Sequence, residues 1–200
     1  MFVLTIDQVD SRRTADAVSD VLVELRAELG GQLLLPPERT AGDEFQLLVD
    51  EPAAALDTIL RLTRAERWSV GCGVGSVREP LPRDIREATG EAFVAARAAV
   101  DRAKKRQTRF ALEAAGARDD AARLESLIDL LLATRSRRSL EGWQLHDLLL
   151  AGHTQAAAAA ELGITPQAAS RRAQAADLKI EAAVTGALVT LLAELDGRAL

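Results

Sequence analysis

The strongest constraint on the fold is an alternation of strand-forming and helix-forming segments, which fills the first 112 residues and then stops. Short runs rich in β-forming residues alternate with segments whose apolar residues recur every three or four positions. The order is βαββαβαβ, which predicts an α+β domain on a single sheet. The expected strands are 2–7, 32–35, 45–49, 68–77 and 108–112, and the expected helices are 14–29, 52–63 and 85–105.

Two prolines and a turn sequence predict a hairpin within this domain. The run 32–35 ends at Pro36-Pro37, and residues 41–44 (Ala-Gly-Asp-Glu) provide turn residues before the run 45–49. Asp7 ends the first expected strand. If these strands are neighbours, Asp7 and either Asp43 or Glu44 meet at one edge of the sheet.

Carboxylates that converge in this way can hold Mg²⁺, which in turn binds the phosphate oxygens of a nucleotide. We therefore take Asp7, Asp43 and Glu44 as candidate metal ligands, and Gly42 as the residue that lets a ligand approach the backbone. A purely structural hairpin is the alternative. Lys104 could neutralise phosphate charge only if the sheet brings the end of its helix to this edge, whereas an exposed helix position is expected for Arg97.

The same residues resemble a known family. Thr5 to Arg13 and Arg39 to Gln46 are similar to the SatD family, and more distantly to GGDEF diguanylate cyclases and class III nucleotidyl cyclases. The resemblance covers roughly residues 1–112 and implies a ferredoxin-like, palm-type domain. Ala41 replaces the first glycine of the diguanylate cyclase signature, and Val94 and Ala95 stand where class III cyclases carry a catalytic asparagine. We therefore expect this domain to bind a ligand rather than to catalyse a reaction.

From residue 120 onward every expected element is a helix. Segment 113–119 is expected to link a palm domain over 1–113 to a helical domain over 120–200. The expected helices are 120–134, 139–151, 154–162, 165–178 and 181–195.

Residues 154–178 have the pattern of a helix-turn-helix. Alanines permit two helices to cross closely, Gly163 provides the turn, and Thr165-Pro166 is an N-cap followed by proline at the first helical position. The motif resembles the helix-turn-helix of bacterial transcription regulators and of sigma-factor DNA-recognition segments. Any pair of antiparallel helices with a surface arginine pair is the alternative.

This motif predicts double-stranded DNA as a partner. Residues 135–179 carry 6 basic and 4 acidic side chains, although the whole chain has a net charge of −5. Arg135, Arg137 and Arg138 either clamp a neighbouring phosphate or lie in a solvated loop. The expected DNA contacts are Thr154, Gln155, Thr165, Gln167, Ser170, Arg171 and Arg172.

The helices 120–134 and 181–195 have apolar stripes that require a partner. They pair with each other within one chain, or between two chains of a homodimer that spaces two DNA half-sites. We expect the homodimer.

The single cysteine, Cys72, permits no internal disulfide, and the short apolar start of the chain does not have the form of a secretory signal. The longest uncharged apolar run, 182–193, is shorter than the roughly 20 residues that a membrane helix needs. We expect a cytoplasmic protein that does not span a membrane.

Together these features predict a dimeric transcriptional regulator whose palm domain senses a nucleotide or another small ligand, with Mg²⁺ as the cofactor that a nucleotide would bring. The alternative is a metal-dependent nucleotidyl cyclase or transferase that uses its helices to form oligomers. A third interpretation makes both halves protein-interaction modules.

Overall fold

The computed structural model describes residues 1–199, which form a mixed α+β structure with a five-stranded sheet and eight α-helices. The strands are β1 (Phe2–Gln8), β2 (Leu33–Ala41), β3 (Glu44–Val49), β4 (Trp68–Val74) and β5 (Phe110–Ala114). Their order across the sheet is β2-β3-β1-β4-β5. Strand β1 is central and antiparallel to both neighbours, whereas β4 and β5 are parallel.

The helices follow the predicted order βαββαβαβ through β5, and only helices come after it. This confirms the α+β class and the β2–β3 hairpin. The helices are α1 (Val18–Leu29), α2 (Pro52–Arg64), α3 (Glu91–Ala103), α4 (Arg118–Arg135), α5 (Leu140–Leu150), α6 (Gln155–Glu161), α7 (Pro166–Ala175) and α8 (Leu178–Arg198).

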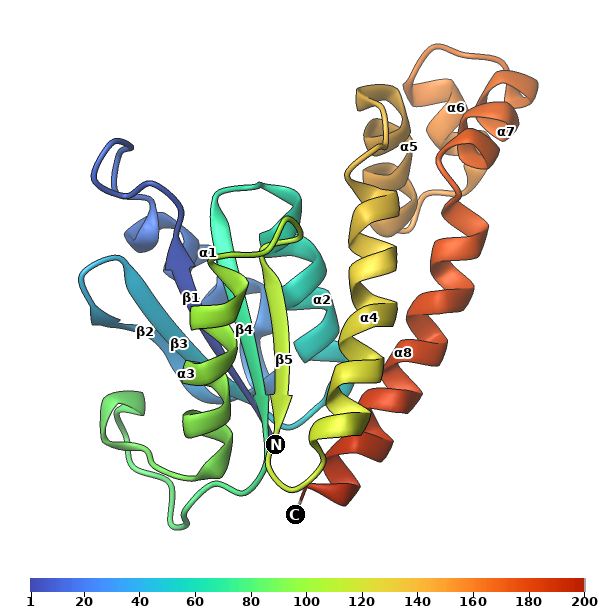
Figure 1. Ribbon diagram of the computed structural model, residues 1–200. Helices are drawn as coiled ribbons and strands as arrows, with labels where there is room; N and C mark the ends of the chain where they lie inside the picture. Colours follow the sequence, from blue (N-terminus) through green and yellow to red (C-terminus); the bar gives the residue numbers. More distant parts are fainter. Residues whose placement is uncertain (200) are drawn as a thin grey trace. The chain divides into compact units, whose positions relative to one another are not determined.

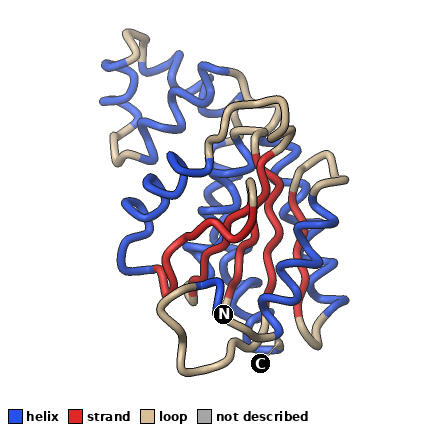
Figure 2. The backbone as a smooth tube through the Cα atoms, turned by 90° about the vertical axis from the view of Figure 1, so that its left-hand side faces the viewer, coloured by secondary structure: helices blue, strands red, loops and turns tan. Residues whose placement is uncertain are grey.

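Helices cover both faces of the sheet, as Figures 1 and 2 show, with α3 on one face and α2 on the other. Helix α3 lies against β4 with no side chain between them at Gly71 and Gly73. A Cβ atom on Gly73 would collide with the backbone of Ala92 and Ala96, and one on Gly71 would collide with the backbone of Val100. Because successive strand residues point to opposite faces, Cys72 points away from α3 and is fully buried.

Several predicted boundaries are wrong for identifiable reasons. Strand β2 continues through Pro36 and Pro37, which an edge strand tolerates because one side of it needs no backbone donors. Helix α1 begins at Val18 instead of Thr14, because the Gln8 side chain bonds the Ala15 carbonyl (2.7 Å) and the Ala17 amide (3.1 Å) and holds that segment out of the helix.

The predicted helix 85–105 is two elements. A single 3₁₀ turn, Ile85–Glu87, precedes α3, which starts only at Glu91. Ile85 and Ala88 pack with Val77 in a core cluster beside α3. Their apolar character therefore reflects burial of a loop and not a helical stripe. The predicted linker 113–119 is also shorter, because β5 continues to Ala114 and α4 begins at Arg118.

The chain forms two compact units. Unit 1 contains Met1–Leu132 together with the chain from Leu188 onward, and unit 2 is Ala133–Ala187. Both boundaries lie inside helices, one in α4 and one in α8, whereas the sequence places the boundary at 113–119.

Ion pairs within unit 1 explain why it includes parts of α4 and α8. The buried Glu125 of α4 accepts hydrogen bonds from the Leu112 amide of β5 (2.7 Å) and from Arg102 beside it (3.4 Å to Oε1). Arg198 of α8 pairs with Asp120 of α4 at 2.9 Å. The unit 1 portions of α4 and α8 are thus joined within one chain.

None of the helices in residues 1–199 has the combination of length and apolar character that crossing a membrane requires.

The contact between α3 and β4 predicts that Gly73→Ala strongly destabilises the protein. The added methyl group has no space against the α3 backbone, and we expect a loss of about 3 kcal/mol in the free energy of unfolding. Urea denaturation followed by circular dichroism measures it. Gly31→Ala is the control, because a Cβ there has nothing within 4 Å. Equal stability of the two variants would contradict the interpretation.

Candidate functional site

Helices α6 and α7 of unit 2 begin at matching threonine caps. The Thr154 hydroxyl accepts a hydrogen bond from the Ala157 amide, and the Thr165 hydroxyl accepts one from the Ala168 amide, both at 3.1 Å. Gly163 lies between the helices with a φ of 64°, a left-handed conformation that favours glycine. The two predicted helices, the predicted Thr165 cap and the turn are therefore present, and Thr154 adds a second cap.

Small side chains bring these helices together over α5. Ala158 of α6 and Ala173 of α7 are buried in one cluster with Leu145 of α5, and Ala169 is fully buried as well. Leu148, Leu149, Leu162 and Leu178 surround this cluster. An alanine-lined interface lets helices approach closely and fixes the direction of α7 within unit 2.

Three of the predicted DNA contacts, Gln167, Ser170 and Arg171, are exposed on the side of α7 opposite its buried alanines. The two cap threonines are also exposed, at the starts of α6 and α7, whereas Gln155 and Arg172 are half-buried. The structure describes where these seven residues lie, and their contact with DNA stays a prediction.

Two of the arginines considered for phosphate contacts are buried instead. The side chains of Arg135 and Arg138 are only 8% and 2% exposed, and both form ion pairs with Glu181 in the first turn of α8. Arg137 between them is exposed. Only Arg137 of the three is therefore placed to meet a phosphate.

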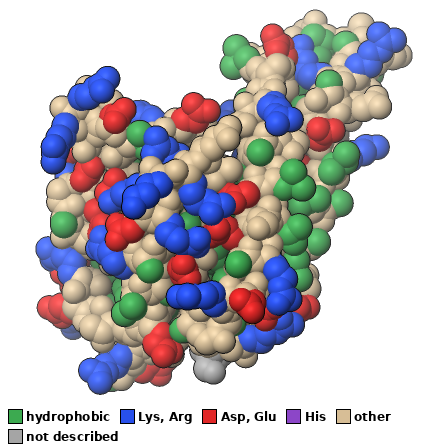
Figure 3. All heavy atoms as spheres, viewed as in Figure 1, with side chains coloured by type: hydrophobic (Ala, Val, Ile, Leu, Met, Phe, Trp, Pro, Cys, Tyr) green, Lys and Arg blue, Asp and Glu red, His purple; other side chains and the backbone are tan. Residues whose placement is uncertain are grey.

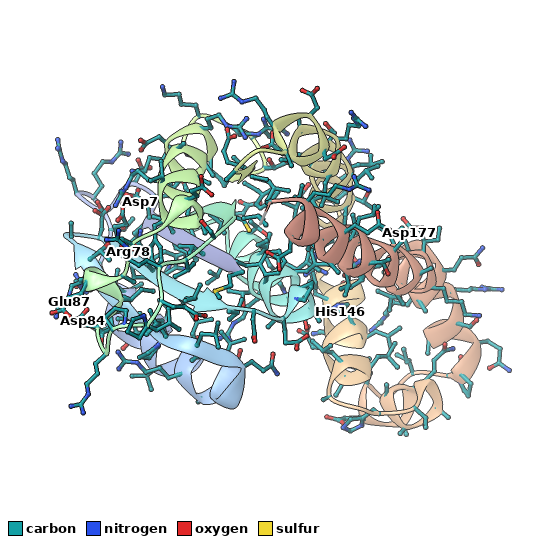
Figure 4. The ribbon with its side chains drawn as sticks, turned by 90° about the horizontal axis from the view of Figure 1, so that it is seen from below. Asp7, Arg78, Asp84, Glu87, His146 and Asp177 are labelled. Atoms are coloured by element: carbon teal, nitrogen blue, oxygen red, sulfur yellow. The ribbon has the colours of Figure 1, made fainter. Side chains whose placement is uncertain are left out.

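Trp143 and His146 of α5 complete this buried cluster (Figure 4 labels His146). The guanidinium carbons of Arg135 and Arg138 lie 4.8 and 4.3 Å from the Trp143 ring centroid, where cation–π attraction is effective. His146 Nε2 is 3.6 Å from Glu181 Oε1. Burial alone would raise the pKa of Glu181, but His146 and the two arginines outweigh it and lower the pKa to about 2.

We expect Glu181→Gln to destabilise the protein by about 3 kcal/mol at neutral pH, because two buried arginines lose their counter-charge. The folded pKa of Glu181 is below the ordinary value of 4.5, so its contribution is complete above that pH and is lost as the pH falls toward 2. Urea unfolding at pH 7 and pH 3 should show a smaller difference from the wild type at pH 3.

Glu161→Gln provides the matched control, since the Glu161 side chain is 54% exposed in the same unit. It should change stability little at either pH. A Glu181 effect that did not depend on pH would argue against the ion-pair cluster.

The predicted carboxylates of unit 1 lie on the face of the sheet that α3 covers. Asp7 of β1 and Glu44 of β3 are direct partners in the antiparallel ladder, and two residues along it the Gln46 amide donates to the Thr5 hydroxyl at 2.9 Å. Asp43 lies in the hairpin turn with Gly42, whose carbonyl accepts a hydrogen bond from Arg39 at 2.7 Å. The sheet thus brings Asp7 and Glu44 together, as expected.

Basic residues of α3 and its C-cap form ion pairs with both of these carboxylates. Lys104 Nζ lies 2.8 Å from Asp7 Oδ2, and Arg97 binds Glu44 with both terminal nitrogens, at 2.6 Å for the Nη2–Oε1 contact. The Thr40 hydroxyl also donates to Glu44 at 2.7 Å. Burial raises the pKa of Asp7, and Lys104 opposes this shift. The end of the helix does reach this edge, and Arg97 has a specific partner that sequence reasoning missed.

This arrangement does not fit the expected Mg²⁺ site. Glu44 is 5% exposed with its oxygens held by Arg97 and Thr40, and Asp7 is held by Lys104. Across residues 1–199 no group of three His, Cys, Asp or Glu side chains is placed to hold a metal ion. The sequence does carry a signal for these two ion pairs, because the seven-residue spacing of Arg97 and Lys104 puts both side chains on one side of a helix.

We expect Arg97→Ala to destabilise the protein by about 2 kcal/mol, because it leaves the buried Glu44 without its guanidinium partner. Adding Glu44→Gln should recover part of this loss, so a double-mutant cycle measured by urea denaturation should give a coupling of about 1 kcal/mol or more. Arg123→Ala is the control, because Arg123 is 74% exposed and pairs with Asp120 of its own helix. Additive effects of the two substitutions would contradict the pairing.

Cys72 has no properties of a nucleophile. It is fully buried in β4, and burial raises the pKa of its thiol to about 12. Cys72 is therefore a small buried residue of the sheet.

No family model, curated protein or solved structure matches the chain. The functional proposal therefore depends on the arrangement of the residues described above.

Proposed function

We propose that the protein binds double-stranded DNA and acts as a transcriptional regulator, with α6 and α7 as a helix-turn-helix and α7 as its recognition helix. The observation that carries the proposal is the division of α7 into two faces. Ala169 and Ala173 are buried against the neighbouring helices, while Gln167, Ser170 and Arg171 are exposed. Glutamine, serine and arginine are side chains that contact base edges and phosphates.

The local charge is compatible with this partner. Unit 2 carries six basic and five acidic residues, within a protein of net charge −5. Arg135 and Arg138 are buried with Glu181, so the positive charge near the surface comes from Arg137, Arg171, Arg172 and Lys179, which an equal number of acidic residues balances (Glu141, Asp147, Glu161 and Asp177). A surface without a large excess of positive charge favours specific docking over indiscriminate binding.

For unit 1 we propose a palm-like, ferredoxin-like domain related to the SatD family that regulates DNA binding. Its support is the strand order β2-β3-β1-β4 with β1 antiparallel to both neighbours, and the carboxylates at the ends of β1 and β3. The alternative, a Mg²⁺-dependent nucleotidyl cyclase or transferase, has less support because Asp7 and Glu44 are held in ion pairs.

Selection from genomic duplex fragments tests the DNA proposal. The purified protein should enrich a defined sequence motif, and enrichment should persist when the salt concentration is raised, because base contacts do not weaken as steeply as phosphate contacts. On the enriched site, Arg171→Ala should weaken binding about tenfold or more, as expected for the loss of one base or phosphate contact.

Arg83→Ala is the matched control, since Arg83 is an exposed arginine of unit 1. The affinity of the Arg83→Ala variant for the enriched DNA site should equal that of the wild type. Retention without any enriched motif, or equal effects of the two substitutions, would reject α7 as a recognition helix.

A further inference from the structure

The outward side of α8 carries almost no charge. Between Lys179 and Glu194 the only charged residue is Glu181, which is buried in the arginine cluster. The exposed residues of this stretch are Ile180, Ala182, Ala183, Gly186, Ala187, Thr190, Leu191 and Ala193. A helix face of small and apolar residues this long is more typical of helix pairing than of a solvated surface.

The steric properties of this face suit another helix. A Cβ atom on Gly186 would meet nothing within 4 Å, so the backbone at this point is open to close approach. Ile180 is 63% exposed and Leu191 is 36% exposed. Both belong to the eight large hydrophobic residues that are exposed in residues 1–199, and Figure 3 shows hydrophobic side chains gathered along α8.

The charges at the ends of the face select the partner. Lys179 and Glu194 are both exposed and lie seven and eight residues from Gly186, one on each side; Glu194 also pairs with Arg198 of its own helix at 3.4 Å. Two antiparallel copies of α8 that cross at Gly186 bring Lys179 of one copy to Glu194 of the other, twice. A parallel pair would instead oppose like charges at both ends.

We propose that this face binds a second copy of the same chain, through antiparallel pairing of α8 with α8 centred on Gly186. The pairing is symmetric, so each contact occurs twice and the assembly closes as a dimer. It does not require that the protein bind DNA. If the DNA proposal is also correct, the dimer supplies the two recognition helices that a palindromic site needs.

Charge reversal provides the first test, with sedimentation equilibrium of the full-length chain in the absence of DNA. The wild type should be a dimer, and Lys179→Glu and Glu194→Lys should each weaken the dimer about tenfold, because each places two like-charged pairs at the interface. The double variant Lys179→Glu/Glu194→Lys should restore it. Lys105→Glu, at an exposed lysine after α3, should have no effect.

A cysteine at the crossing point provides the second test. Gly186→Cys should form a disulfide-linked dimer under mild oxidation, and the native Cys72 does not compete because it is fully buried. A monomeric wild type, or a dimer that neither charge reversal weakens and Gly186→Cys does not cross-link, would overturn the proposal. Because both tests are made without DNA, such a result would not bear on the DNA-binding proposal, which the selection experiment tests separately.

Discussion

The contact of α3 with β4 at Gly71 and Gly73 is the constraint on which unit 1 depends. With no side chain between them, the backbone of α3 packs directly against the backbone of β4, so the helix cannot slide or rotate on the strand without a steric clash. This packing determines which α3 residues face the sheet. Arg97 falls over Glu44, and Lys104 at the end of the helix falls over Asp7. Arg102 on the same helix bonds the buried Glu125 of α4.

Buried carboxylates play the same part in both units. Glu44, Glu125 and Glu181 are each nearly inaccessible to solvent, and each accepts hydrogen bonds from basic residues on other segments of the chain. An ionised carboxylate cannot remain in such a place without these partners, so each one specifies how the neighbouring elements must meet. In unit 1 this joins α3 to the hairpin and to α4, and in unit 2 it joins the end of α4 and the segment before α5 to the start of α8.

The sequence predicts what depends on near neighbours in the chain. The hairpin, the cap at Thr165 and the turn at Gly163 follow from local chemistry, and all are found. Arg135 and Arg138 are different, because their burial depends on Glu181, more than 40 residues away. The pairing of Arg97 with Glu44 is equally remote in sequence. Charge alone does not show whether an arginine faces solvent or a buried acid.

The ion pairs also bear on which half of the protein meets a ligand. In unit 1 the carboxylates considered for a metal are already held in ion pairs, with Asp7 joining β1 to Lys104 and Glu44 joining the hairpin to α3. In unit 2 the buried arginines are neutralised while Gln167, Ser170 and Arg171 are left exposed. A surface whose polar groups are not engaged by the chain itself retains its capacity to bind another molecule. That difference favours α7, and not the carboxylate cluster, as the site of recognition.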